Sequence, residues 1–296
     1  MIEKYYSGVI EQIYNRIGKE TRNIVMANYS NDFSIENLEV IRRYQSNEDN
    51  VFFAYSEFSY NTLIGAYEPF LDIICNMHRR FIGGSFDDFQ KECGVYYLHR
   101  QVLNSYYETG ECFREEMVLL NEVAYEQRRM TMAIADMLKR LSEVKPLMIV
   151  INRFQMASKS SIETIKYLID NPCANIGIVL GVNALVKGAD STVEVWDSIV
   201  ESLEDRSAVY YIGSAGQLKN TVKTTNDDEM YITMNFEQSI QEASNIMEFL
   251  DFEQAKRGCR IIEHKLKFED AWIDEKSLRR FYMVYARTSV LLGEMS

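Results

Sequence analysis

The feature that most constrains the fold is a strand, helix, strand pattern near the middle of the chain. Residues 147–151 (Leu-Met-Ile-Val-Ile) and 176–180 (Ile-Gly-Ile-Val-Leu) are short apolar runs, typical of strands buried on both faces of a parallel sheet. Between them, residues 158–170 place apolar side chains at helical spacing, with Ser160 or Ser161 positioned to cap the first turn. Because parallel neighbours need such a crossover, the pattern predicts an α/β protein with helices on both sheet faces.

The residues that follow the first run carry a family resemblance. Residues 147–161 (Leu-Met-Ile-Val-Ile-Asn-Arg-Phe-Gln-Met-Ala-Ser-Lys-Ser-Ser) resemble the Walker B segment of the STAND branch of AAA+ ATPases. In that family a hydrophobic strand ends in one or two acidic residues, which organise Mg²⁺ and the attacking water. Asn152 and Arg153 stand at those positions here, and Ser158 stands where the family often has aspartate. The segment therefore keeps the frame of the motif and lacks its carboxylates.

An N-terminal segment aligns with the phosphate-binding loop of the same family. A predicted strand ends at Ala27, and a predicted helix over residues 34–44 has Ser34 at its N-cap. A working loop needs glycines so that backbone amides wrap the phosphates, a lysine for the outer phosphates, and a hydroxyl on Mg²⁺. Only Ser34 matches this pattern, because Ala27 and Asp32 fill the two glycine positions and Phe33 replaces the lysine.

The resemblance implies a nucleotide pocket in which both motifs are degraded. Asp32 would direct a carboxylate at a polyphosphate, and the two would repel each other. We therefore expect no cofactor and assign no catalytic residue; ATP or ADP with Mg²⁺ remains a weakly bound alternative. For a nucleotide held without hydrolysis, the candidate binding residues are Ser34 and Asn152, next to Phe33 and Arg153, together with backbone donors at the helix start.

The remaining pattern up to residue 230 completes a predicted α/β domain. Tyr67, Pro69 and Phe70 match a group that precedes a long helix in the resembled family. Periodicity predicts further helices over 2–17, 86–141 and 193–203, and further strands over 22–27, 50–55 and 208–212. By resemblance, the fold class is a three-layer α/β parallel sheet of the P-loop NTPase (AAA+) type.

The C-terminal pattern predicts helices only. Residues 246–262 resemble the end of one tetratricopeptide helix, its tight turn and the next helix, with Ala255 at the small packing position. Residues 282–293 resemble the first helix of another unit, and such repeats need neighbours to bury their apolar faces. We expect two domains: a degenerate STAND NTPase-like domain over 1–230, and a tetratricopeptide-like region over 231–296 that is the front of a longer natural protein.

Composition limits the partners. A net charge of −12 weighs against nucleic acid, and we expect the short basic stretches at 78–80 and 279–280 to be solvated helix faces. No apolar run approaches the ~20 residues needed to cross a bilayer, and no basic-then-apolar leader opens the chain. We therefore expect a cytoplasmic protein with no membrane partner and with its five widely spaced cysteines reduced.

Metal and cysteine–histidine chemistry are the other candidates. Cys75, His78, Cys93 and His99 supply four side chains of the kinds that bind zinc. However, Cys75 and His78 lie in an apolar helical pattern, and no second tight pair follows. No sequence context marks any cysteine as an activated nucleophile. We therefore predict no metal site and expect these residues to be part of the core.

The function that the resemblance implies is a catalytically inactive STAND/AAA+ regulatory module of a bacterial signalling protein. Its expected partners are other protein domains or its own downstream output domain, and self-association stays open. One alternative is a nucleotide-binding ATPase switch with non-standard motif residues. Another is a DNA-binding AAA+ protein, which needs a winged helix where this sequence predicts tetratricopeptide-like helices.

Overall fold

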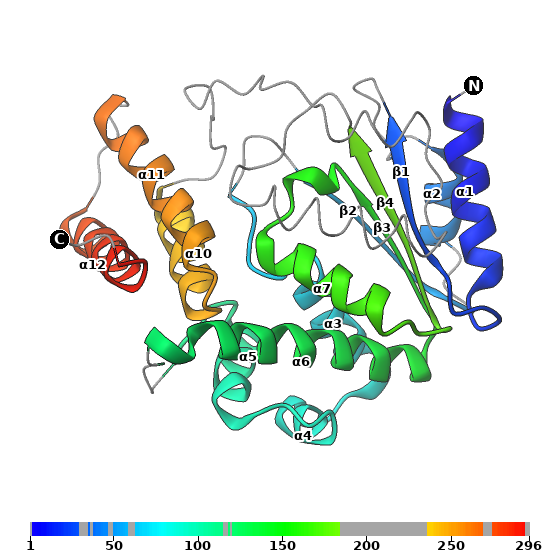
Figure 1. Cartoon of the computed structure of the whole chain (residues 1–296), viewed down its shortest axis with the longest axis horizontal. Coiled ribbons are helices and arrows are strands. Elements are labelled where there is room, and N and C mark those ends of the chain that lie inside the picture. Colours follow the sequence, from blue (N-terminus) through cyan, green and yellow to red (C-terminus); the bar gives the residue numbers. More distant parts are fainter. Residues whose placement is uncertain are drawn as a thin grey trace.

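A computed structural model of the chain shows an α/β core with a group of C-terminal helices at one end (Figure 1). The structure describes residues 2–29, 35, 38–46, 50–58, 63–114, 118, 120–183, 236–268 and 274–293. The predicted helix over 193–203, the predicted strand over 208–212 and the proposed domain boundary at 230 lie outside these residues. No helix within them is long and apolar enough to pass through a lipid bilayer.

Among the described residues, the core contains a four-stranded parallel sheet in the order β1-β4-β3-β2. The strands are β1 (Ile24–Tyr29), β2 (Phe52–Glu57), β3 (Leu147–Asn152) and β4 (Ile176–Asn183). All six residues of β3 are buried, as expected for a central strand covered on both faces. The parallel sheet and the two apolar strands predicted from the sequence are therefore confirmed.

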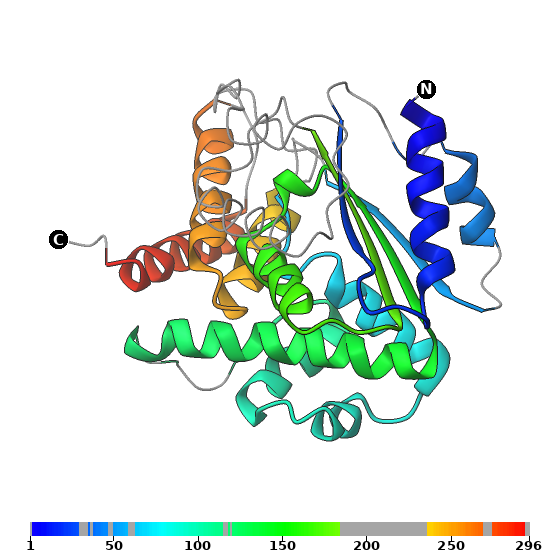
Figure 2. The ribbon, with the colours of Figure 1, turned by 45° about the vertical axis from the view of Figure 1, so that its right-hand side comes forward.

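Successive side chains of a strand point to opposite faces of the sheet, so each face packs against a different set of helices. On one face, Val25, Val150 and Val179 pack with α1 (Ile2–Arg16) and α2 (Glu39–Ser46). The next residues along these strands, with Phe52, join a larger cluster on the opposite face. Figure 2 shows α1 and α2 on one side of the sheet and α7 on the other, so the core has three layers.

The second face is covered by the helices that connect β2, β3 and β4. They are α3 (Phe70–Met77), which continues as a π-helical turn over His78–Ile82, then α4 (Phe86–Glu92), α5 (Tyr97–Thr109), α6 (Val123–Val144) and α7 (Lys159–Asp170). These elements confirm the mainly helical prediction for residues 86–141. Tyr67 and Pro69 directly precede α3, which begins at Phe70 and has 8 residues before the π-helical turn.

Two predicted helix starts are wrong. The helix expected to begin at Ser34 begins at Glu39; the amide of Leu38 donates to the Ile35 carbonyl at 3.0 Å in a preceding turn. Helix α7 is capped by Ser158, whose backbone is extended and whose hydroxyl accepts from the Ser161 amide. Ser160 and Ser161 are already helical, so neither can be the N-cap residue.

The C-terminal helices pack directly on the α/β core. They are α10 (Phe236–Glu248), α11 (Phe252–Phe268) and α12 (Glu275–Leu291), so the helix predicted over 282–293 begins earlier, after the capping residue Asp274. Asn245 of α10 joins the two parts: its amide oxygen accepts from the Cys112 amide at 2.9 Å, and its nitrogen donates to the Gly110 carbonyl at 3.0 Å. Ile246 and Ile262 belong to the same hydrophobic cluster as α3 and α6.

The close approach of α1 to the sheet depends on Gly177 of β4. A Cβ atom at this position would lie 2.8 Å from Ile17 Cδ1 and 2.9 Å from Ile13 Cγ2. We predict that Gly177→Ala lowers the free energy of unfolding by about 1–3 kcal/mol through overpacking. Urea denaturation followed by circular dichroism measures the change.

Gly8 provides the matched control for this substitution. It lies on the exposed side of α1, and a Cβ atom there would have no neighbour within 4 Å. Gly8→Ala should therefore raise the free energy of unfolding by roughly 0.5–1 kcal/mol through helix propensity. Equal stability of the two variants would contradict the packing assigned to Gly177.

Candidate functional site at the carboxyl edge of the sheet

The carboxyl ends of the four parallel strands lie along one edge of the sheet. Glu57 at the end of β2 pairs in register with Asn152 of β3, and Tyr29 of β1 pairs with Asn183 of β4. The chain leaves β1 for α2 on one face and leaves β3 for α7 on the other. In open α/β sheets, this change of direction opens the crevice in which ligands bind.

Asn152 is fully buried at this edge. Its side-chain oxygen accepts from the Arg153 amide at 3.0 Å. A Cβ atom on Gly181 of β4 would lie 2.9 Å from that oxygen and 2.6 Å from Ile35 Cδ1. Gly181 therefore leaves the space that the Asn152 side chain occupies, and the amide is a packed structural group.

Arg153 forms an ion pair with Glu57. Its backbone is left-handed, with φ of 55°, and its Nη1 lies 3.1 Å from Glu57 Oε1. The Tyr55 hydroxyl donates to the other carboxylate oxygen of Glu57 at 2.7 Å. Both members of the pair are largely shielded from water, with 23% and 19% of their side chains exposed. The charge of Arg153 is therefore neutralised inside the protein.

Of the four residues named from the sequence, the structure describes Asn152 and Arg153, which are adjacent at the end of β3. Ser34 and Phe33, like Asp32, lie outside the described residues. Glu57 was missed, because it ends a different strand and only the register of β2 against β3 brings it to this edge. The sequence signal that could have indicated Glu57 was an acidic residue just after an apolar run.

The segment after β3 connects this edge to the rest of the molecule through serines. The Ser160 hydroxyl accepts from the Tyr67 amide at 3.0 Å, and the Ser161 hydroxyl donates to the Glu68 carbonyl at 2.7 Å. Both partners lie in the loop before α3. The start of α7 is thus fixed to the segment that follows β2.

The same helix start is bonded to the C-terminal helices through Asp251. This buried residue lies between α10 and α11; its carboxylate accepts from the Ser160 amide at 3.3 Å and from the Gln254 amide at 3.4 Å. Burial raises the pKa of Asp251, and hydrogen bonds from Ser160 and Gln254 oppose that rise. One carboxylate therefore faces the first turns of two helices, where backbone donors favour negative charge.

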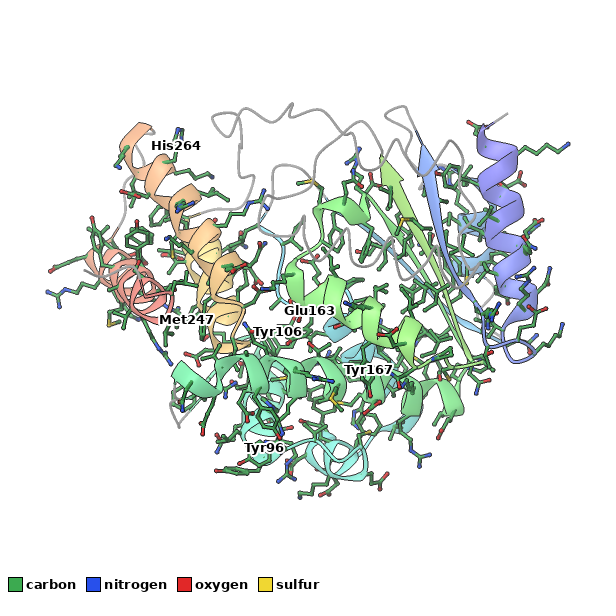
Figure 3. The ribbon with its side chains drawn as sticks, in the orientation of Figure 1. Tyr96, Tyr106, Glu163, Tyr167, Met247 and His264 are labelled. Carbon is green, nitrogen blue, oxygen red and sulfur yellow. The ribbon has the colours of Figure 1, made fainter. Side chains whose placement is uncertain are left out.

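A cavity of about 360 Å³ contains several acidic groups where α10 meets the core. Glu68, Asp72 and Glu242 line it, and the Tyr106 hydroxyl donates to Asp72 at 3.0 Å. The pKa of Glu242 is raised to about 7, first by burial and then by the carboxylates of Glu68 and Asp72. Figure 3 shows Tyr106 close to the C-terminal helices.

The cysteines and histidines considered for metal binding are separate core groups. Among the described residues, no three or more His, Cys, Asp or Glu side chains are arranged to hold a metal ion. His78 Nδ1 lies 3.1 Å from the Tyr107 hydroxyl, and burial lowers the pKa of His99 to about 3. Burial also raises the pKa of the Cys75 and Cys93 thiols to about 12, which keeps them protonated and unreactive at neutral pH.

Comparison with other proteins adds no assignment to this geometry. The chain matched no model of a known protein family and no curated protein. The described features are an α/β parallel sheet, an ion pair between Arg153 and Glu57 at its carboxyl edge, and polar contacts from that edge to the C-terminal helices. Any function must therefore be argued from these features.

Glu242 generates a pH prediction. Its pKa is raised from 4.5 to about 7 in the folded protein, so folding favours the protonated acid. The resulting stability is fully present below pH 4.5 and is lost as the pH rises through about 7. Glu242→Gln should therefore match the wild type near pH 4 and exceed its free energy of unfolding at pH 8 by on the order of 2 kcal/mol.

Urea denaturation across this pH range measures the difference. Glu237→Gln is the control, because Glu237 is exposed in the first turn of the same helix. That variant should follow the wild-type pH profile. An unchanged profile for Glu242→Gln would contradict the placement of Glu242 against Glu68 and Asp72.

Proposed function

We propose that this chain is a catalytically inactive regulatory module of the STAND/AAA+ type, part of a bacterial signalling protein. It acts through protein contact and does not turn over ATP. In this proposal the parallel sheet is a degenerate P-loop NTPase-like domain, and α10 to α12 begin a tetratricopeptide-like region. Cytoplasmic location and an output through a further protein domain are parts of the same proposal.

The observation that carries the proposal is the ion pair between Arg153 and Glu57. ATP hydrolysis on this fold needs a carboxylate for Mg²⁺ and a group that orients the attacking water. At the end of β3 there is an amide, Asn152, packed against Gly181, and a guanidinium that already has an acidic partner. Neither group can coordinate Mg²⁺ as a carboxylate would, and the paired guanidinium is a poor ligand for phosphate.

The contacts of α7 support a role in transmission between domains. Ser160 bonds to the loop before α3 and to Asp251, and Lys159 lies 3.8 Å from Glu253 of α11. A displacement at the carboxyl edge would therefore reach the C-terminal helices through a short chain of buried polar groups. Such contiguous contacts suit a protein whose output is a change in helix packing.

The outer surface of α12 supports protein contact as the output. Tyr282 is 57% exposed and Met283 is 67% exposed. In stacked helical repeats, side chains at such positions pack against a helix of the next unit. An adjoining helical unit is therefore the partner that this surface suits.

Nucleotide binding is the direct test of the inactive-module proposal. Titration with a fluorescent ATP analogue, with and without Mg²⁺, should give no saturable binding below about 1 mM. The reason is that Phe33 replaces the lysine of the resembled motif, and Asn152 and Arg153 replace its acidic residues. A phosphate-release assay should show no turnover above the background without protein. Binding in the micromolar range that needs Mg²⁺ and is accompanied by turnover would contradict the proposal.

Two variants identify the site if binding without turnover is seen. Ser34→Ala and Asn152→Ala remove the two side chains that the resemblance assigns to a nucleotide. Loss of binding in Ser34→Ala would indicate a nucleotide held without hydrolysis, the alternative derived from the sequence. Unchanged binding in both variants would place the nucleotide elsewhere.

A further inference from the structure

The acidic cavity around Glu242 lies at the contact between α10 and the core. Its walls come from the loop before α3, from α3, from α5 and from α10. A Cβ atom on Gly65 would lie 2.7 Å from Glu242 Oε1, so the carboxyl group is seated against that loop. Asn245, which bonds to Gly110 and Cys112, lies nearly one turn further along α10. Glu242 and Asn245 therefore share the face of α10 that is docked on the core.

Three carboxyl groups meet in this cavity without a basic partner. Glu68 accepts from the Gly65 amide at 2.8 Å, and Asp72 accepts from the Tyr106 hydroxyl at 3.0 Å. No lysine, arginine or histidine is among the described residues that line the cavity. Ionised neighbours repel a charge on Glu242 strongly here, because the space is shielded from water. The docked position therefore favours the protonated acid.

The other titratable groups that face Glu242 in the described part of the chain are neutral. Tyr106 belongs to α5, and Cys112 belongs to the segment after α5. Burial raises the pKa of both side chains, so neither is ionised near neutral pH. Burial also raises the pKa of Glu68. The charge in the cavity therefore depends on its three carboxyl groups.

We propose that Glu242 is a proton-sensitive latch that holds α10 on the α/β core. Protonated Glu242 occupies the cavity, and the helix stays docked. When Glu242 ionises, repulsion by Glu68 and Asp72 favours a state in which α10 moves away from the loop before α3 and the carboxylate reaches water. The sheet stays folded in both states, since β1 to β4 pair with one another and contribute no residue to the cavity.

The latch regulates one contact within the molecule. It goes beyond the inactive-module proposal and does not rest on it, because it involves none of the nucleotide-site residues. The buried side chains of α10, among them Ile240 and Ile246, favour docking at every pH. Ionisation of Glu242 therefore shifts a population toward the open state and does not detach the helix completely.

The pKa of Glu242 sets the pH range of the latch. It is about 7 when α10 is docked, and it returns toward 4.5 when the carboxyl group is exposed. The contribution of Glu242 to docking is therefore fully present below pH 4.5 and is lost as the pH rises through about 7. Between pH 4.5 and pH 8, this linkage raises the open population by on the order of 30-fold.

Hydrogen exchange of the full chain, measured by mass spectrometry at pH 4.5 and pH 8, tests the latch. Comparing Glu242→Gln with the wild type at the same pH cancels the intrinsic pH dependence of exchange. At pH 8 the amides of α10 should exchange on the order of 30-fold faster in the wild type, and at pH 4.5 the two proteins should agree within about threefold. Equal exchange of α10 at pH 8 would overturn the proposal.

Low concentrations of urea separate local opening from unfolding of the whole chain. Exchange through a local opening depends little on urea, because little surface is exposed. At pH 8 the amides of α10 in the wild type should therefore be insensitive to urea, while those of β3 exchange faster as urea is added. An α10 that shares both the protection and the urea dependence of β3 would also overturn the proposal.

Two further variants test the charges themselves. Asp72→Asn removes one repelling charge but keeps an oxygen that accepts from Tyr106, and it should slow the exchange of α10 at pH 8 by roughly threefold or more. Glu237→Gln, at an exposed position in the same helix, should behave as the wild type. Wild-type exchange in Asp72→Asn would refute the repulsion on which the latch depends, even if Glu242→Gln failed to fold.

Discussion

The buried carboxylate of Asp251 is the interaction on which the arrangement of the molecule depends. It accepts hydrogen bonds from the first turn of α7, which follows the central strand β3, and from the first turn of α11. A carboxylate removed from water is stable only with such donors. Because the donors come from both parts of the chain, the α/β core and the C-terminal helices must be packed together to satisfy it.

At the carboxyl edge of the sheet, too, polar and charged groups find their partners within the protein. Arg153 and Glu57 neutralise each other there. The Asn152 side chain accepts a hydrogen bond from the Arg153 amide and occupies the space that Gly181 leaves open.

Local patterns in the sequence predicted the elements of the core but not the contacts between them. Strands β3 and β4 were recognised because strands covered on both faces are apolar throughout. The cap of α7 was misplaced by two or three residues, because three nearby serines are equivalent until backbone angles select Ser158. Glu57 and Asp251 were missed because their partners are distant in sequence; Asp251 lies 91 residues from Ser160. Strand register and tertiary packing decide such pairs.

Hydrogen exchange measured by mass spectrometry on Asp251→Ala tests the central claim most directly. If this carboxylate joins the two parts, the variant should lose protection in the first turns of both α7 and α11. Asp274→Ala is the control, because Asp274 caps α12 in the same way, accepting from the Lys276 and Ser277 amides, and should affect α12 alone. Loss of protection in α11 with α7 unchanged would contradict the account.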